Sequence, residues 1–279
     1  MATYRSGTST CILGDQHLSD AIRGIAAAGF DCIEISAPLK SYMEDFDLLH
    51  RYGEYAALAA QEGIALWSLH LPFSRVHDIS SEDENARSEA ILTNLSLIDA
   101  AHKMGIGTVV LHPSSEPIAD DRRAVRMGLS RDGILRHVER AARYGMAVAV
   151  EDLPRTCLCN TAEEMLALLA DTGARVCFDT NHCLKEDSVA FLDALRVGGA
   201  RVQTLHLSDY DRVDERHILP GTCVNDWKGI LDTLARMDYR GPLMYEVSQR
   251  PRSYPGLLNT PEDVKRNFDW LSALSAPKE

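Results

Sequence analysis

The sequence predicts an α/β protein in which the whole chain, residues 1–279, forms a single-domain (β/α)8 barrel, the TIM barrel fold. Eight short segments of apolar and β-branched residues recur along the chain, and a longer segment of helical character follows each of them. A chain of 279 residues suits this fold, because such barrels commonly use about 250 residues as one domain. No Gly-x-Gly-x-x-Gly follows the first strand, so a dinucleotide-binding open sheet lacks its main support.

The predicted strands are short and mostly continuous in their apolar character. TVVL at 108–111, AVAV at 147–150 and VCF at 176–178 are typical of parallel strands that are buried on both faces. We expect the eight strands at residues 8–12, 32–36, 65–71, 108–112, 147–151, 176–180, 202–207 and 243–248.

The segments between these strands have the composition and spacing of amphipathic helices. They are rich in Ala, Leu, Glu and Arg, and their apolar residues recur at three- and four-residue intervals. Gly29, Gly63, Gly105, Gly145 and Gly173 each stand where such a helix would end before the next strand. The expected helices cover residues 18–28, 54–62, 86–104, 132–144, 162–170, 188–195, 227–237 and 261–274.

Composition and charge argue against several classes of function. A formal net charge of -12 disfavours binding to nucleic acid, since that affinity depends on Lys and Arg at the phosphates. No apolar run approaches the roughly 20 residues that cross a bilayer, and the first residues lack the apolar stretch of a signal peptide. Seven cysteines, an odd number in a long chain, favour reduced thiols. We therefore expect a cytoplasmic protein with no nucleic-acid or membrane partner.

Metal-binding residue types end six consecutive predicted strands. The active site of this fold lies at the carboxyl ends of the strands, so these residues are the candidates. His, Asp and Glu are the side chains that commonly bind divalent metals. They are His70 in SLHLP, His112 in VVLHP, Glu151 in VAVED, Asp179 and His182 in CFDTNH, His206 in TLHLSD, and Glu246 in MYEVS.

Each candidate also has a structural interpretation. A single His in an apolar strand is more often a hydrogen-bonded core residue than a ligand. A buried ionised carboxylate is costly unless a cation or a donor compensates it, which favours Glu151, Asp179 and Glu246 as functional residues. Arg212 and His217 follow the seventh strand and could reach the site, although a solvated loop explains them equally well. We expect the remaining histidines to be structural or exposed: His17, His50, His77, His102 and His137.

These motifs resemble the xylose isomerase-like TIM barrels over about residues 8 to 274. The superfamily includes ketose 3-epimerases, hydroxypyruvate isomerase, inosose dehydratase and endonuclease IV. The resemblance rests on His70 in HLP, His112 in HP, Glu151, Asp179 and His182 in FDTNH, His206, His217 in HILPG, and Glu246.

The resemblance to ketose 3-epimerases implies one divalent ion bound by Glu151, Asp179, His206 and Glu246. Mn²⁺ is the expected ion, with Mg²⁺, Co²⁺ or Zn²⁺ as alternatives, because three carboxylates and one imidazole form a mostly hard ligand set. The substrate-contacting His and Arg of those enzymes resemble His182 and Arg212. Six residues after the first metal ligand those epimerases have a substrate-binding Glu, where this chain has Cys157, a departure that argues against a ketohexose as the substrate.

The nine zinc-ligand positions of endonuclease IV also have counterparts here, with Glu215 where that family has Asp. They resemble His70, His112, Glu151, Asp179, His182, His206, Glu215, His217 and Glu246. The DNA-binding loops of that enzyme, however, have no match in IEISAPLK or SLHLPFS. Together with the acidic charge, this makes DNA cleavage a minor alternative.

We therefore predict a metal-dependent isomerase or epimerase of a ketose, keto-sugar or small hydroxy-ketone. A metal-bound carbonyl and hydroxyl would allow loss of the α-proton to an enediolate, with Glu151 and Glu246 as the acid–base pair. His70, His112, His182, Arg212 and His217 are the predicted substrate contacts. A lyase or dehydratase acting on a keto-sugar, keto-inositol or 3-keto-glycoside shares the first step and is the main alternative, and a binding barrel without turnover is a further one. The sequence is also compatible with a homodimer.

Overall fold

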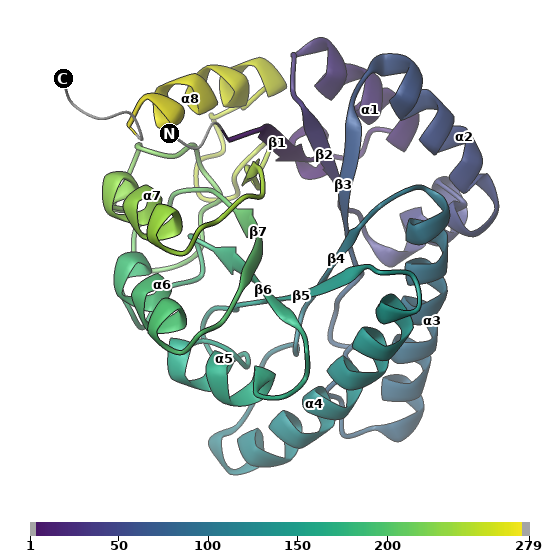
Figure 1. Cartoon of the computed structure of the whole chain (residues 1–279), viewed down its shortest axis with the longest axis vertical. Helices are drawn as coiled ribbons and strands as arrows, with labels where there is room; N and C mark the ends of the chain where they lie inside the picture. Colours follow the sequence, from purple (N-terminus) through teal and green to yellow (C-terminus); the bar gives the residue numbers. More distant parts are fainter. Residues whose placement is uncertain (1–3, 275–279) are drawn as a thin grey trace.

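The computed structural model describes residues 4–274 and shows a barrel of eight parallel strands surrounded by helices (Figure 1). The strands pair in the order β7-β6-β5-β4-β3-β2-β1-β8. A backbone hydrogen bond from the Leu207 N–H to the Met244 carbonyl oxygen, 2.9 Å long, joins β7 to β8 and closes the ring. The predicted (β/α)8 fold is therefore confirmed.

The eight strands lie close to their predicted positions. They are β1 (Ser6–Ser9), β2 (Cys32–Ile35), β3 (Ala65–His70), β4 (Thr108–Leu111), β5 (Ala147–Glu151), β6 (Arg175–Asp179), β7 (Val202–His206) and β8 (Leu243–Tyr245). The first strand differs most, because residues 10–12 belong to the 3-10 helix η1 (Thr10–Leu13) instead of the strand. The Ser9 hydroxyl accepts a hydrogen bond from the Cys11 N–H at the start of this turn.

The main helices cover the outside of the barrel, and most of them match the prediction. They are α1 (Leu18–Ala27), α2 (Leu48–Glu62), α3 (Glu84–Lys103), α4 (Asp120–Ala142), α5 (Ala162–Leu169), α6 (Ser188–Val197), α7 (Trp227–Arg236) and α8 (Pro261–Leu274). Gly63 has a φ of 72° directly after α2, as expected for a residue that ends a helix in the left-handed conformation.

The prediction placed the start of α4 twelve residues too late. Residues 120–131 carry many charges and lack the apolar spacing of the second half of this helix. Ion pairs hold this first part in place: Arg123 binds Glu164, and Arg126 binds Asp78 with an Nη2–Oδ2 distance of 2.5 Å. The short π-helix η2 (Ser41–Asp45) was also not predicted.

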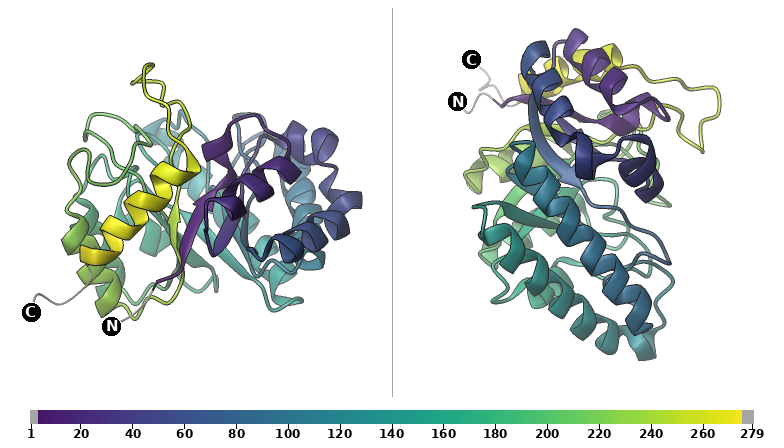
Figure 2. Two further views of the ribbon diagram at one scale, coloured as in Figure 1. Left: turned by 90° about the horizontal axis from the view of Figure 1, so that it is seen from above. Right: turned by 90° about the vertical axis from the view of Figure 1, so that its right-hand side faces the viewer.

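The hydrophobic core lies between the sheet and the helices, while the interior of the barrel is partly polar. Inside the barrel, Val110, Ala149 and Cys177 form a small apolar cluster. Buried polar side chains pair with one another in the same interior, as in the 2.7 Å hydrogen bond from Ser68 to Glu34. The connection between β8 and α8 projects beyond the other loops at the carboxyl end of the barrel (Figure 2). Within residues 4–274, no helix is both long and apolar enough to span a membrane.

Candidate active site

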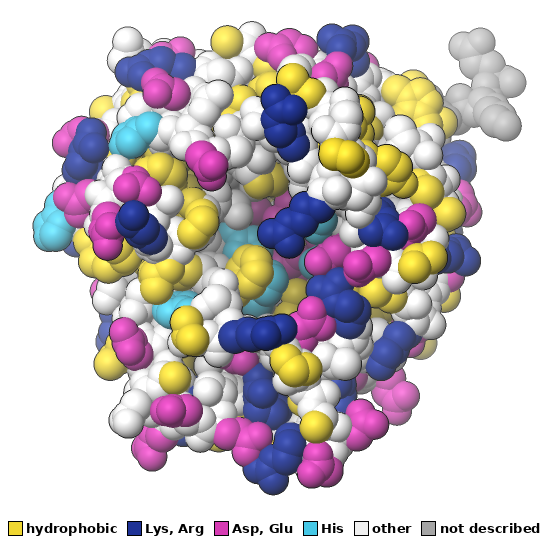
Figure 3. All heavy atoms as spheres, turned by 180° about the vertical axis from the view of Figure 1, so that it is seen from behind, with side chains coloured by type: hydrophobic (Ala, Val, Ile, Leu, Met, Phe, Trp, Pro, Cys, Tyr) yellow, Lys and Arg dark blue, Asp and Glu magenta, His cyan; other side chains and the backbone are white. Residues whose placement is uncertain are grey.

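The carboxyl ends of the strands surround a cavity of about 310 Å³. The space-filling view of this face shows a central hollow with histidine and acidic side chains inside it (Figure 3). Glu151, at the end of β5, and Glu246, directly after β8, both line the cavity. This position is the usual place of the active site in barrels of this kind.

Three carboxylates and one imidazole meet at the base of the hollow. One ligand atom from each of Glu151, Asp179, His206 and Glu246 lies within 4.8 Å of the others. His206 Nδ1 is 3.0 Å from Glu151 Oε1 and 3.6 Å from Glu246 Oε2. The structure thus brings together the four residues that the sequence analysis had proposed as metal ligands.

This group fits a divalent cation, because three carboxylates and one imidazole converge at one point. Asp179 Oδ2 is buried and accepts no hydrogen bond; His182 Nδ1 lies 3.4 Å from it as an ion pair. Burial raises the pKa of Asp179 well above its usual value; His182 opposes this shift, while the nearby charges of Glu246 and Glu151 raise the pKa further. Buried charges need a partner, and a cation among these oxygens would supply it.

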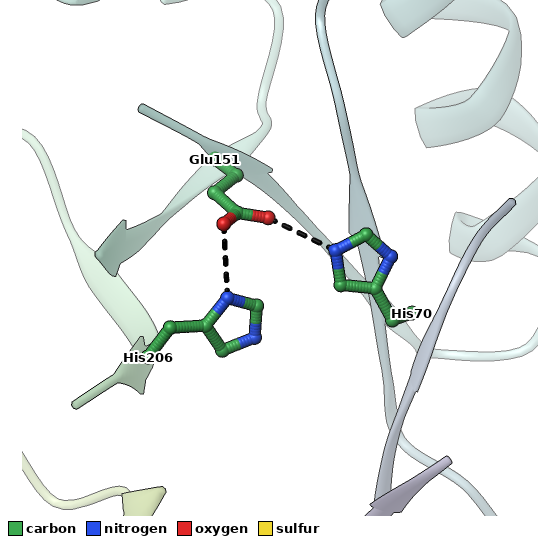
Figure 4. A group of neighbouring side chains, drawn as sticks. All are labelled: His70, Glu151 and His206. Atoms are coloured by element: carbon green, nitrogen blue, oxygen red, sulfur yellow. Dashed lines mark hydrogen bonds and ion pairs between the residues drawn. The ribbon is translucent and has the colours of Figure 1, made fainter. Parts of the chain in front are cut away.

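Glu151 is the central residue of the group. Its Oε2 atom lies 3.0 Å from His70 Nε2, while its Oε1 atom faces His206 (Figure 4). The same Oε2 atom lies 3.1 Å from His112 Nε2. Burial alone would raise the pKa of Glu151, but His206 and His112 hold it well below the usual value. The carboxylate is therefore ionised at neutral pH.

A second group of metal-binding residue types lies at the edge of the cavity. It consists of His182, Glu215 and His217, whose ligand atoms also lie within 4.8 Å of one another. His182 Nε2 is 3.4 Å from Glu215 Oε2. Although burial opposes it, His182, His217 and Arg155 lower the pKa of Glu215 to about 2.

The predicted substrate contacts fall into three positions. His112, His182 and His217 line the cavity. His70 lies beneath it, buried against Glu151. Arg212 lies outside the lining of this cavity: its side chain is 53% exposed and its Nη2 is 2.5 Å from Asp187 Oδ2. Its backbone φ of 62° belongs to a turn in the loop, and this turn sends the side chain toward α6.

Two residues of the site were not singled out from the sequence. Glu34 of β2 is fully buried, and its Oε1 lies 2.9 Å from His206 Nε2. The sequence does indicate Glu34, because it is an acidic residue inside the otherwise apolar segment CIEI. Arg155 lines the cavity from the loop after β5 and pairs with Glu116, Asp214 and Glu215. No spacing in the sequence indicates this position.

Comparisons with known proteins agree with this architecture. The L-ribulose-5-phosphate 3-epimerase of Salmonella paratyphi A is 23% identical over 267 residues, which cover 92% of this chain and 89% of that protein. Endonuclease 4 of Thermus thermophilus is 32% identical over 142 residues, which cover 44% of this chain and 49% of that protein.

Solved structures show the same barrel. The D-psicose 3-epimerase of Clostridium cellulolyticum H10, crystallised with D-tagatose, superposes with a TM-score of 0.80 at 20% identity. The match covers 97% of this chain and 99% of that one. The model of the family described as xylose isomerase-like TIM barrel matches residues 22–274. The chain therefore belongs to the xylose isomerase-like TIM barrel family.

Proposed function

We propose that this protein is a divalent-metal-dependent epimerase or isomerase of a ketose or keto-sugar. The observation that carries the proposal is the convergence of Glu151, Asp179, His206 and Glu246 below an open cavity, with a buried Asp179 oxygen that accepts no hydrogen bond. These four residues would bind the ion, most simply Mn²⁺. When bound, the cation would stabilise negative charge that develops on the carbonyl oxygen of the substrate.

The two glutamates have the position that proton transfer requires. Of the four residues, Glu151 and Glu246 line the cavity, whereas Asp179 and His206 are fully buried. Burial alone would raise the pKa of Glu246, but His206 and His217 lower it, so this carboxylate is also ionised. One glutamate would remove the proton from the carbon next to the carbonyl group, and the other, after taking up a proton from solvent, would donate it to the opposite face; the first then releases its proton to solvent.

The other side chains of the cavity would orient the sugar. His112, His182 and His217 can donate or accept hydrogen bonds to its hydroxyl groups. Phe73 supplies an apolar surface on one side of the cavity. Full-length similarity to a sugar-phosphate 3-epimerase supports epimerisation over the lyase reaction.

The decisive experiment is a hydrogen-exchange screen of the purified, metal-loaded protein in deuterated solvent. Ketopentoses, ketohexoses and their phosphates would be followed by NMR for deuterium at the carbon next to the carbonyl group and for appearance of the epimer. We expect exchange with at least one of these sugars, and its loss on chelation of the metal. Exchange that persists at the same rate after complete metal removal would contradict the proposal.

A second candidate function is metal-dependent cleavage of a phosphodiester. It is favoured by the additional His182, Glu215 and His217 group and by partial similarity to an endonuclease. The net charge of -12 opposes it, because a DNA backbone would be repelled. Incubation of the zinc-loaded protein with a duplex that contains an abasic site distinguishes the two, since only the nuclease would cut it.

A further inference from the structure

A second, larger cavity lies beside the candidate active site. Its volume is about 810 Å³, and it lies among the segments that follow β1 and β2. The catalytic cavity alone, with about 310 Å³, is already in the range of small-ligand sites, which span about 300–1,000 Å³. A single small sugar held at Glu151 and Glu246 would therefore leave the second cavity empty.

Phe73 joins the two cavities, since its side chain lines both. The ring stacks on His112 with a centroid distance of 3.7 Å and lies 5.4 Å from the ring of His70. Both histidines contact Glu151. The second cavity thus begins one aromatic ring away from a carboxylate that we assign to proton transfer, and 52% of Phe73 remains exposed to a ligand.

Cys11 provides a second connection, on the side of β8. It lines the second cavity, and its Sγ lies 3.5 Å from the carbonyl oxygen of Val247, the residue after Glu246. Burial raises the pKa of the Cys11 thiol, and the negative charge of Glu246 raises it further. Neither glutamate lines the cavity itself, and Phe73 and Cys11 are the residues that connect it to the two sides of the proposed acid–base pair.

The lining of the second cavity matches an uncharged ligand with many hydroxyl groups. It contains no Lys or Arg within the described chain, and the carboxylates of Asp15 and Asp45 would repel a phosphate or a carboxylate. Ser36 and Gln16 add neutral donors and acceptors, and Asp15 and Gln16 make no hydrogen bond within residues 4–274. Phe73 offers an aromatic face.

We propose that this cavity is a subsite for a second, uncharged sugar ring, so that the substrate is a glycosylated ketose or keto-sugar. The inference rests on the proposed function, because the reacting carbon is placed at Glu151 and Glu246 while the attached ring extends past Phe73. The substituent would contribute binding energy through hydrogen bonds to groups that a free monosaccharide does not reach.

The test compares sugars that share one reacting unit. Fructose, maltulose and isomaltulose all contain fructose with a free carbonyl carbon, and the last two carry a glucosyl ring on O4 or O6. For each we would measure hydrogen exchange in deuterated solvent and the dissociation constant by calorimetry, with the Mn²⁺-loaded protein. Ser41→Trp would fill the cavity with a large ring, and Ser96→Trp, on the exposed side of α3, is the matched control.

We expect kcat/KM for at least one glycosylated sugar to exceed that for fructose by roughly tenfold, the effect of one or two hydrogen bonds. Ser41→Trp should bring the ratio of kcat/KM for the glycosylated sugar to that for fructose close to one, and Ser96→Trp should preserve this ratio. Equal values for all sugars in the wild type, or a ratio that Ser41→Trp leaves intact, would overturn the subsite. If no sugar exchanges, fructose is not the reacting unit, and the dissociation constants decide the subsite alone: a glycosylated sugar must bind roughly tenfold more tightly than fructose to the wild type but not to Ser41→Trp.

Discussion

Glu34 and His206 form a buried pair in which Glu34 Oε1 lies 2.9 Å from His206 Nε2. Because Nε2 is occupied in this way, Nδ1 of the same ring faces Glu151 and Glu246. A metal-binding His is commonly oriented by a carboxylate that accepts a hydrogen bond from its other ring nitrogen. Ser68 donates a 2.7 Å hydrogen bond to Glu34 Oε2 and so fixes the carboxylate in turn.

We predict that Glu34→Gln weakens metal binding. The amide removes the negative charge behind His206, and comparable changes lower metal affinity by roughly 10- to 100-fold. Competition with a chromogenic chelator would measure the dissociation constant. Glu44→Gln is the control, because the Glu44 side chain is 67% exposed and, among the described residues, pairs only with Lys40 at 3.9 Å. An unchanged dissociation constant in a correctly folded Glu34→Gln protein would show that the pair does not position His206 for the metal.

Replacement of the Glu246 carboxylate by an amide should separate proton transfer from metal binding. Glu246→Gln keeps the shape and one coordinating oxygen but cannot accept a proton, so metal affinity should fall modestly. Loss of a general base typically lowers the rate by about 10²–10⁴-fold. The measurement is α-proton exchange with the substrate found in the screen, at saturating metal. Normal exchange by the fully loaded variant would leave Glu151 as the sole base.

Asp179→Asn should mainly lower metal affinity, whereas Glu246→Gln should mainly lower the rate of proton transfer. Asp179 is fully buried and absent from the cavity lining, so its side chain cannot reach a substrate there. We expect weaker metal affinity with partial recovery of activity at high metal concentration. To test this difference, activity is measured as a function of metal concentration for Asp179→Asn and for Glu246→Gln. Activity that stays low at every metal concentration, with the ion bound, would assign Asp179 a role beyond coordination.

One metal ion per chain is the expected stoichiometry. The group of Glu151, Asp179, His206 and Glu246 has three carboxylates, one of them with a buried oxygen that accepts no hydrogen bond, whereas the group of His182, Glu215 and His217 has a single carboxylate beside two imidazoles. Elemental analysis of the dialysed protein would give the count, and His217→Ala should not change it. Three ions per chain, reduced to two by His217→Ala, would shift the balance toward phosphodiester cleavage.

The free energy of unfolding should fall between pH 6.5 and pH 4 because of His137. Burial lowers the pKa of this fully buried His to about 4, while the unfolded chain would take up a proton near 6.5. Stability from the neutral ring is present above pH 6.5 and is lost as the pH falls through 4, by up to about 3 kcal/mol. Denaturant unfolding across this range, for wild type and His137→Gln, measures it. The variant should show a shallower decline, and an identical slope would contradict the assignment.

The residues at the strand ends were predictable because their signals are local. Continuous apolar runs mark buried parallel strands, and the fold brings all their carboxyl ends to one rim, so Glu151, Asp179, His206 and Glu246 could be grouped from sequence. The barrel and the full set of strand-end candidates follow from this periodicity, whereas the resemblance to the ketose 3-epimerases selected these four residues as the metal ligands.

Only the tertiary structure decided which more distant side chains take part. Glu34 and His206 are 172 residues apart, and their contact depends on how β2 and β7 face each other across the barrel. Arg155 turns into the cavity and Arg212 turns away, because their ion-pair partners come from other loops. The early turns of α4 depend on Glu164 and Asp78 in the same way. Strand patterns are encoded in neighbouring residues, whereas loop side chains take their direction from charges that only the folded chain brings near.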